Sequence, residues 1–174
     1  TEDYDWLSAH LDDPKVVVLD ARGRMLYRFG HIENALPIGI ESLVSVADNG
    51  ANLVIDSRTA EEVFTQFRID NSKAVVVYGE NTDPSAARVV WSLLYHGHPN
   101  VKLLEIGFSE WMKVGLATSK QIPTYTTPND AHFSSRINSS IRADEQTIKD
   151  RMHTGEIIIL DSRTPQEHFQ ARIP

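Results

Sequence analysis

The sequence VVVLDAR occupies residues 16–22, and the closely similar IIILDSR occupies residues 157–163. The same offset holds on both sides of this motif without a gap, since Leu7 matches Ile148 upstream and Ile32 matches Ile173 downstream. Four β-branched or leucine residues followed by Asp-x-Arg can recur by chance, but the same helix, strand and turn context at one constant offset rarely does. The sequence therefore predicts two copies of one module, the first complete and the second incomplete.

The offset also predicts how the chain is divided. If the module is as long as the offset, only residues 142–174 remain for the second copy, and one helix with one strand cannot close a core. We expect the first module at residues 1–117, a linker with Pro123, Pro128 and several serines at residues 118–141, and the truncated start of the second module at residues 142–174. The natural protein is expected to be longer than this chain.

Composition and charge exclude several classes of protein. The net charge is −7 and the basic residues form no cluster, so nucleic acid is not an expected partner. No apolar run approaches the roughly 20 residues needed to span a bilayer, so a membrane is not expected either. Cysteine is absent, which excludes disulfides, zinc held by cysteine and thiol chemistry within these residues. No cofactor is expected, and a cytoplasmic location is favoured over an exported one without being fixed.

Strands and helices alternate along the first module. Continuous apolar runs at residues 16–20, 74–78 and 101–106 predict strands that are buried on both faces, as in a parallel sheet. Helical periodicity is expected at residues 2–11, after Thr59, after Asp83, and at residues 108–114. This alternation predicts an α/β fold with a mainly parallel, open sheet flanked by helices. The second copy repeats the pattern with a helix at residues 143–153 and a strand at residues 157–161.

Four local signals mark helix ends. Thr59 and Glu62 fit a capping box at a helix start. Asp83 followed by a proline fits a helix N-cap, and Gly97 fits a glycine that ends the same helix. A second capping signal, residues 164–167, follows the repeated strand.

The candidate site lies where the strands end, because ligands of open α/β sheets sit beyond the carboxyl ends of the strands. The loop GENTD at residues 79–83 is at this edge and precedes a helix N-terminus. It contains no cysteine, and the carboxylates of Glu80 and Asp83 oppose an incoming anion. A capped, solvated loop is therefore favoured over an anion site.

The Asp-x-Arg pairs, Asp20 with Arg22 and Asp161 with Arg163, follow the two equivalent strands. Each pair could orient a site through charge-assisted hydrogen bonds, or it could pin the next loop, which is the favoured alternative. His96 and His98 lie at a helix C-terminus, where histidine interacts favourably with the helix dipole. With no third ligand at a useful spacing, no metal site is expected.

Three stretches together resemble the rhodanese (sulfurtransferase) family in its tandem-domain form. They are VVVLDARGRMLYRFGHIENALPIGI at residues 16–40, AVVVYGENTDPSAARVVWSLLYHG at residues 74–97 and VKLLEIGFSEWMKVG at residues 101–115. In this family a catalytic cysteine follows the central strand, and Gly79 occupies that place here. Tandem members commonly lack the cysteine in the first domain and supply it from the second. Ile106 departs from the family's Gly-Gly pair, and Arg172 replaces its usual histidine.

The resemblance implies a function for the complete protein. Sulfane sulfur would move from a small anionic donor, thiosulfate or 3-mercaptopyruvate, to a thiophilic acceptor such as cyanide. This chain would be the inactive half that packs on the second rhodanese domain, with Phe108 and Trp111 in a wall of the interdomain cleft. The motif residues Asp20, Arg22, His31, Arg88, Asp161 and Arg163 would have structural roles. Two alternatives remain: a rhodanese-like binding or regulatory module without catalysis, and a phosphatase related to the cell-cycle dual-specificity enzymes.

Overall fold

The computed structural model describes residues 1–48, 50–81, 83–124 and 129–170. The chain divides into two compact units, Thr1–Asn138 and Ser139–Pro174. The repeat match at Ile173 and the departure from the family at Arg172 lie outside the described residues.

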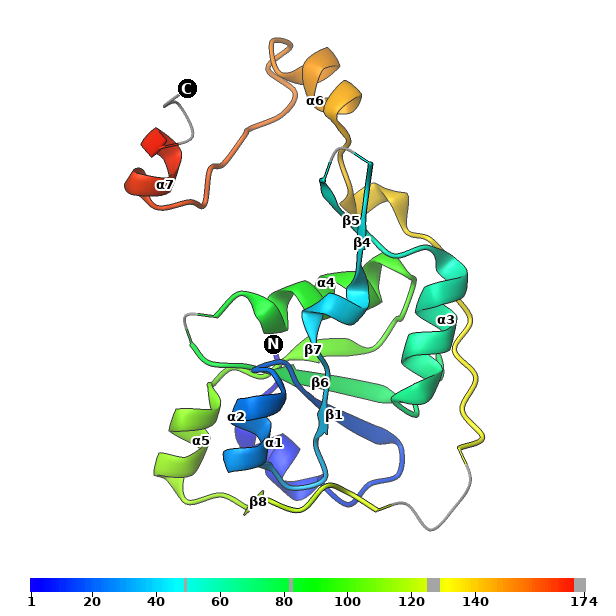
Figure 1. Ribbon diagram of the computed structural model, residues 1–174, viewed down its shortest axis with the longest axis vertical. Helices are drawn as coiled ribbons and strands as arrows, with labels where there is room; N and C mark the ends of the chain where they lie inside the picture. Colours follow the sequence, from blue (N-terminus) through cyan, green and yellow to red (C-terminus); the bar gives the residue numbers. More distant parts are fainter. Residues whose placement is uncertain (49, 82, 125–128, 171–174) are drawn as a thin grey trace. The chain divides into compact units, whose positions relative to one another are not determined.

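A four-stranded parallel sheet lies at the centre of the first unit (Figure 1). β1 and β6 pair in register along their whole lengths, from Val16 opposite Ala74 to Asp20 opposite Tyr78. The predicted α/β fold with a parallel sheet is thereby confirmed. In spatial order the strands are β3 (Leu36–Pro37), β1 (Val16–Asp20), β6 (Ala74–Tyr78) and β7 (Val101–Leu103).

Two elements at the edge of the sheet are shorter than predicted. β7 ends at Leu103, and Leu104 forms only a single parallel bridge with Glu2. The first helix, α1, spans Tyr4–Ala9 instead of residues 2–11. Glu2 instead bridges to Leu104 in extended conformation, and the Asp3 side chain caps the helix by accepting the Asp5 N–H at 2.6 Å, so α1 begins at Tyr4.

Helices α3 (Ser57–Gln66) and α4 (Ser85–Tyr95) cover one face of the sheet (Figure 1). Their apolar side chains pack with every second residue of the strands, since successive strand residues point to opposite faces. This cluster includes Val17, Leu19, Val75 and Val77 from the sheet, Ala60 and Phe64 from α3, and Ala86, Val89 and Leu93 from α4.

The opposite face is covered by α1, α2 (Arg24–Phe29) and α5 (Phe108–Val114). The short antiparallel pair of β2 (His31–Ile32) and β8 (Thr118–Ser119) lies on the same side. The cluster on this face includes Leu7, Val18, Ile32, Val76, Tyr78, Phe108 and Trp111. Both faces of the central strands are therefore buried, as the continuous apolar runs predicted.

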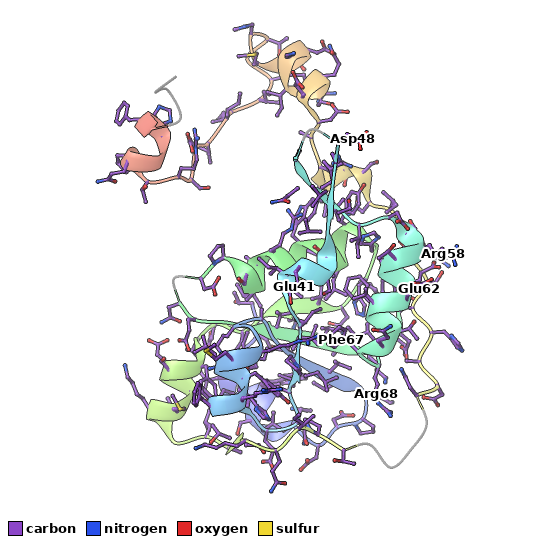
Figure 2. The ribbon with its side chains drawn as sticks, viewed as in Figure 1. Glu41, Asp48, Arg58, Glu62, Phe67 and Arg68 are labelled. Carbon is purple, nitrogen blue, oxygen red and sulfur yellow. The ribbon has the colours of Figure 1, made fainter. Side chains whose placement is uncertain are left out.

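The start of α3 differs from the predicted capping box. The N-cap is Asp56, whose carboxylate accepts the Thr59 N–H at 3.0 Å. Thr59 therefore lies inside the helix, and Glu62 pairs with Arg58 on its exposed face at 3.2 Å (Figure 2). The prediction was wrong because an aspartate three residues earlier offers an equally good cap. At α4 the N-cap is Pro84, one residue after the predicted Asp83, although the Asp83 carboxylate accepts the Ser85 N–H at 2.8 Å; His96 is the C-cap, and Gly97 with its positive φ follows it.

The remaining elements of the first unit are short. A 3-10 helix, η1 (Ile40–Leu43), leads into a hairpin of β4 (Val44–Val46) and β5 (Asn52–Val54). Residues 129–138 then run along the unit without regular secondary structure, and Phe133 enters the cluster formed with α3 and α4. The polar, irregular sequence of this segment did not predict a core residue.

The second unit contains η2 (Ser139–Ile141), α6 (Glu145–Arg151) and α7 (Pro165–Gln170). The strand predicted at residues 157–161 is absent: these residues have no regular secondary structure, and Ile158 and Leu160 are 87% and 86% exposed. The physical reason is pairing. β1, its counterpart, bonds to β3 on one side and β6 on the other, whereas residues 157–161 pair with no strand in the described part of the chain. Among all described residues, no helix combines the length and the apolar character that crossing a bilayer requires.

Candidate functional site

A buried ion pair lies at the carboxyl end of β1. The Arg22 guanidinium contacts the Asp20 carboxylate through Nε at 3.0 Å and Nη2 at 2.6 Å, and the Arg22 backbone N–H bonds to the same carboxylate at 2.9 Å. The exposed fractions of the two side chains are 4% and 0%. Burial opposes the charge on Arg22, but hydrogen bonding and attraction to Asp20 outweigh it, so the pKa of Arg22 is raised.

Tyr78 completes this network from the neighbouring strand. Its hydroxyl donates to Asp20 Oδ2 at 2.5 Å and accepts the Ile32 N–H at 3.1 Å. Burial, together with the negative charge of Asp20, raises the pKa of Tyr78 far above its ordinary value. Tyr78 is therefore a fixed hydrogen-bond donor and not a proton source near neutral pH.

Arg22 also connects three loops. Nη2 donates to the Gly30 carbonyl at 2.7 Å, which fixes the end of α2. The guanidinium carbon lies 3.8 Å from the centroid of the Phe108 ring, a close cation–π contact with the first residue of α5. Nη1 lies 3.7 Å from a carboxylate oxygen of Glu80. Arg22 thus contacts residues of the segments that follow β1, β6 and β7.

Gly79 directly follows β6 and has no side chain to offer as a nucleophile. Its carbonyl accepts the Phe108 N–H at 3.0 Å, and a Cβ built on it would lie 3.2 Å from the Cβ of Ala86. The next residue, Glu80, directs its second carboxylate oxygen toward the Ser109 N–H at 3.4 Å. The carboxylate of Glu80 therefore occupies the space in front of Arg22 and α5.

A cavity of about 250 Å³ opens beside this loop. It is bounded by residues 79–81 and 103–107 and by Asp83, Ala86 and Ala87. Its described lining holds the carboxylates of Glu80, Asp83 and Glu105 and no cationic side chain. Such a lining repels a small anion, and it offers no thiol, hydroxyl or imidazole for nucleophilic attack.

Several predicted residues have structural positions elsewhere in the first unit. His31 is buried in β2, with Nδ1 2.9 Å from the Tyr27 carbonyl and Nε2 3.1 Å from the Gln121 carbonyl. Arg88 lies on α4 with its guanidinium carbon 5.1 Å from the Trp91 ring centroid. Trp111 is fully buried and donates its indole N–H to the Ala117 carbonyl at 3.0 Å.

Comparison with known proteins agrees with this geometry. The family model of the rhodanese-like domain matches residues 3–114, which is more than half of the chain. The chain belongs to the rhodanese-like domain family. The resemblance recognised from the three sequence stretches is thereby confirmed.

Characterised relatives are sulfur-handling proteins. The chain is 30% identical over 171 residues to the sulfur carrier protein TtuD of Thermus thermophilus, covering 94% of this chain and 58% of the relative. It is 29% identical over 164 residues to a thiosulfate sulfurtransferase of Corynebacterium glutamicum, covering 93% and 54%. The chain thus spans little more than half the length of these relatives.

Solved structures agree on the fold. The crystal structure of SseA from Escherichia coli, described as a 3-mercaptopyruvate sulfotransferase, superposes with a TM-score of 0.81 at 22% identity. The superposition covers 99% of this chain and 68% of that one.

The Asp-x-Arg motif at residues 161–163 forms the same ion pair as the motif at residues 20–22. Arg163 contacts Asp161 through Nε at 2.9 Å and Nη2 at 2.6 Å, and its backbone N–H donates to the same carboxylate at 3.1 Å. The hydrogen bonds from Arg163, followed by that from His168, lower the pKa of Asp161. His168 lies 2.8 Å from the carboxylate oxygen of Asp161 that corresponds to the one bound by Tyr78 in the first unit. Both side chains of this second pair are partly exposed to solvent.

The two histidines at the end of α4 are buried in the first unit. His96 Nδ1 lies 2.9 Å from the Ser135 hydroxyl, and His98 stacks on Phe133 with ring centroids 6.0 Å apart. Burial lowers the pKa of both histidines. Within the part of the chain that the structure describes, no three His, Cys, Asp or Glu side chains gather to hold a metal ion.

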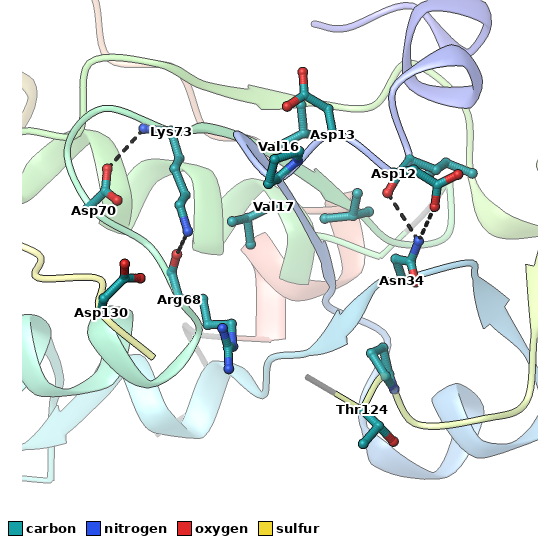
Figure 3. Close-up of a pocket in the computed structure, with 14 residues that line it drawn as sticks. Asp12, Asp13, Val16, Val17, Asn34, Arg68, Asp70, Lys73, Thr124 and Asp130 are labelled. Carbon is teal, nitrogen blue, oxygen red and sulfur yellow. Dashed lines mark hydrogen bonds between the residues drawn. The ribbon is translucent and has the colours of Figure 1, made fainter. Parts of the chain in front are cut away.

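A larger hollow of about 610 Å³ lies at the opposite, amino-terminal end of β1 (Figure 3). Its polar groups largely bind one another. The Asn34 amide donates to Asp12 at 3.0 Å, and Lys73 Nζ donates to the Arg68 carbonyl at 2.8 Å. Asn34 and Arg68, both with positive φ, line this hollow. It lies away from the carboxyl edge, where α/β proteins place their ligands.

The sequence did not identify Tyr78 or Gly30 as parts of the carboxyl-edge network. A signal for Tyr78 existed: two predicted strands of equal length, paired in parallel and in register, align Asp20 with Tyr78. No comparable signal pointed to the Gly30 carbonyl. The predicted role of Phe108 and Trp111 in an interdomain cleft stays a prediction, and in the first unit both side chains are buried.

Proposed function

We propose that this chain is the non-catalytic half of a tandem sulfurtransferase. The complete protein transfers sulfane sulfur from thiosulfate or 3-mercaptopyruvate to a thiophilic acceptor such as cyanide. The first unit packs against the completed second rhodanese module and forms one wall of its active site. Phe108 and Trp111 support that wall from within, because both anchor α5 in the core.

The observation that carries the proposal is the chemistry of the first unit's carboxyl edge. Gly79 stands where a rhodanese nucleophile would stand, and three carboxylates line the adjacent cavity. This module therefore neither attacks sulfur nor attracts an anionic donor. The second Asp–Arg pair supports a further module that repeats the same scaffold, and the greater length of the sulfurtransferase relatives is consistent with one.

The proposed reaction needs a thiolate from the second module. The thiolate attacks the sulfane sulfur of thiosulfate, the S–S bond breaks, and sulfite leaves with the electron pair. The resulting persulfide gives its outer sulfur to cyanide, which forms thiocyanate and restores the thiolate. Backbone N–H groups and cationic side chains of the second module would stabilise the anions of both steps.

The test compares two proteins. The complete gene product is expected to form thiocyanate from thiosulfate or 3-mercaptopyruvate, and replacing the cysteine of its second central loop by serine should abolish the activity. Residues 1–174 alone are expected to form none. Turnover by this chain, free of contaminating enzyme, would contradict the proposed division of labour.

A binding or regulatory role without catalysis is the second candidate. It is favoured by the carboxylate of Glu80, which already occupies the space in front of Arg22. If the second central loop also lacks cysteine, this role replaces the first. A relative named as a sulfur carrier protein suggests an intermediate case, in which the complete protein carries sulfur.

A further inference from the structure

Helix α2 of the first unit turns most of its surface toward solvent. Five of its six side chains are exposed, and only Tyr27 is buried. Three of the exposed side chains are large and apolar: Met25, Leu26 and Phe29 are 75%, 47% and 72% exposed. We call these three residues the α2 face. Contiguous apolar side chains of this size commonly mark an interaction surface.

The α2 face is held in a fixed orientation. The buried Tyr27 donates its hydroxyl to the Ala35 carbonyl at 2.8 Å, and its ring stacks on His31 with centroids 3.7 Å apart. At the end of the helix, Arg22 binds the Gly30 carbonyl. A surface fixed in this way loses little conformational entropy when a partner binds.

The second copy of the module has no such face. At the constant offset between the two copies, the positions of Met25, Leu26 and Phe29 are taken by Gln166, Glu167 and Gln170. The scaffold therefore does not itself require apolar residues at these positions. The α2 face is a feature of the first copy alone, as expected when two modules meet through different surfaces.

The arginines on the same helix indicate what kind of partner surface would fit the α2 face. Arg24 and Arg28 flank the apolar residues and are exposed. Within the described residues neither arginine belongs to an ion pair. A partner surface with apolar side chains would complement the α2 face, and carboxylates on the same surface would complement the two arginines.

We propose that the part of the second module beyond residue 174 docks on the α2 face and places carboxylates near Arg24 and Arg28. The inference rests on the proposed tandem organisation. The relatives extend well beyond the length matched here, and α2 follows Arg22 at the ligand-binding edge of the sheet. A module tethered to the same chain has a high effective concentration, so it competes favourably with a second copy of the protein for this surface.

Methionine oxidation tests the proposal without any mutation. Residues 1–174 and the complete gene product are exposed to dilute hydrogen peroxide, and sulfoxide at Met25 is followed by mass spectrometry. Because thioether oxidation follows exposure, covering Met25 should slow its oxidation about fivefold or more in the complete protein. A methionine-containing peptide added to both samples serves as the reference, because Met112 lies on α5, which the proposed function places in the wall of the active site.

Each outcome decides the question. Slower oxidation of Met25 in the complete protein than in residues 1–174, relative to the added peptide, supports the docking surface. Equal rates in the two proteins overturn it. Protection of Met25 in residues 1–174 that disappears on dilution would identify a second copy as the occupant, and would also overturn it.

A variant provides an independent readout. In the complete protein, Met25→Ser combined with Phe29→Ser should speed proteolytic cleavage of the segment between the modules about tenfold, since a lost apolar contact of about 1.4 kcal/mol corresponds to that factor. Val46→Ser, at an equally exposed site on the β4–β5 hairpin, should leave the rate unchanged. Equal cleavage of both variants would overturn the proposal.

The two proposals fail separately. Protected Met25 without thiocyanate formation would remove the proposed activity and leave the docking surface. Thiocyanate formation with Met25 fully reactive would remove the docking surface only.

Discussion

Replacing Arg22 by methionine should destabilise the first unit strongly. The substitution keeps most of the side-chain volume but leaves Asp20, whose side chain is fully buried, without its cation. Removing one partner of a buried ion pair costs about 3–5 kcal/mol. Asp20 keeps the hydrogen bonds from Tyr78 and from the backbone of residue 22, so we expect a loss near the lower limit, about 3 kcal/mol.

The matched control is Lys102→Met. Lys102 and Glu2 form an ion pair at a similar distance, 2.8 Å, but the Lys102 side chain is 45% exposed. Exposed ion pairs contribute about 0–1 kcal/mol to the free energy of unfolding, so Lys102→Met should cost no more than this. Both variants are compared with the parent chain by equilibrium urea unfolding, followed by tryptophan fluorescence and circular dichroism.

The double variant Arg22→Met with Asp20→Asn separates the two causes of the loss. If the unpaired carboxylate dominates, the double variant should recover part of the stability lost by Arg22→Met. Should Arg22→Met fail to fold, Arg22→Lys is measured instead; it keeps the charge but not the two-pronged contact, and it should fall between the parent and the methionine variant. Equal losses in Arg22→Met and Lys102→Met, within about 0.5 kcal/mol, would refute the reasoning from burial.

Three further predictions concern the same unit and use the same urea assay. Tyr78→Phe should cost about 2–4 kcal/mol, because it removes a bond to a charged group and leaves a buried N–H unpaired, whereas Tyr4→Phe should cost less than about 0.5 kcal/mol; similar losses would argue against the network. Burial lowers the pKa of His96 and His98 in the folded state. Because the unfolded chain then binds protons more readily than the folded chain, the free energy of unfolding should fall as the pH drops below the ordinary histidine pKa of 6.5. His98→Gln should reduce this dependence between about pH 7.5 and 5.5, and an unchanged slope would count against the assignment. Phe133→Ala should cost about 3–5 kcal/mol as a core truncation; a loss below about 1 kcal/mol would show that its segment is not part of the core.

The sequence predicted the central strands well and the edge elements less well. β1 and β6 have their predicted bounds, because a strand buried on both faces shows a continuous apolar run whatever its neighbours are. β7 and α1 lie where the start of the chain meets the last strand, and Glu2 bridges to Leu104 instead of joining the helix. Such pairing joins residues far apart in sequence, so no local pattern reveals it.

The candidate site was predicted in part for the same reason. Asp20 and Arg22 are close neighbours in the chain, and their pairing was visible in the sequence, as was the negative rim of the loop after β6. The contribution of Tyr78 depends on strand register, and the contact between Arg22 and Glu80 depends on how two loops meet. Short-range chemistry was therefore predictable, and long-range contacts were not.

The second copy shows this limit most clearly. Its Asp161–Arg163 pair forms as in the first unit, because the contact is local. The strand at residues 157–161 does not form, because a strand in a parallel sheet exists only with its neighbours. Sequence similarity to β1 predicted the capacity to form a strand, but residues 157–161 pair with no other strand among the described residues.

The anchoring of Phe133 has a practical consequence for producing the first unit in isolation. The family match ends at residue 114, yet Phe133 packs edge-to-face against Phe64 at a centroid distance of 4.9 Å. A fragment cut at residue 117 would leave aromatic surface uncovered and would be prone to aggregate. A recombinant fragment of the first unit should therefore extend to Asn138. A protease that cleaves after this residue would leave the packing of Phe133 intact.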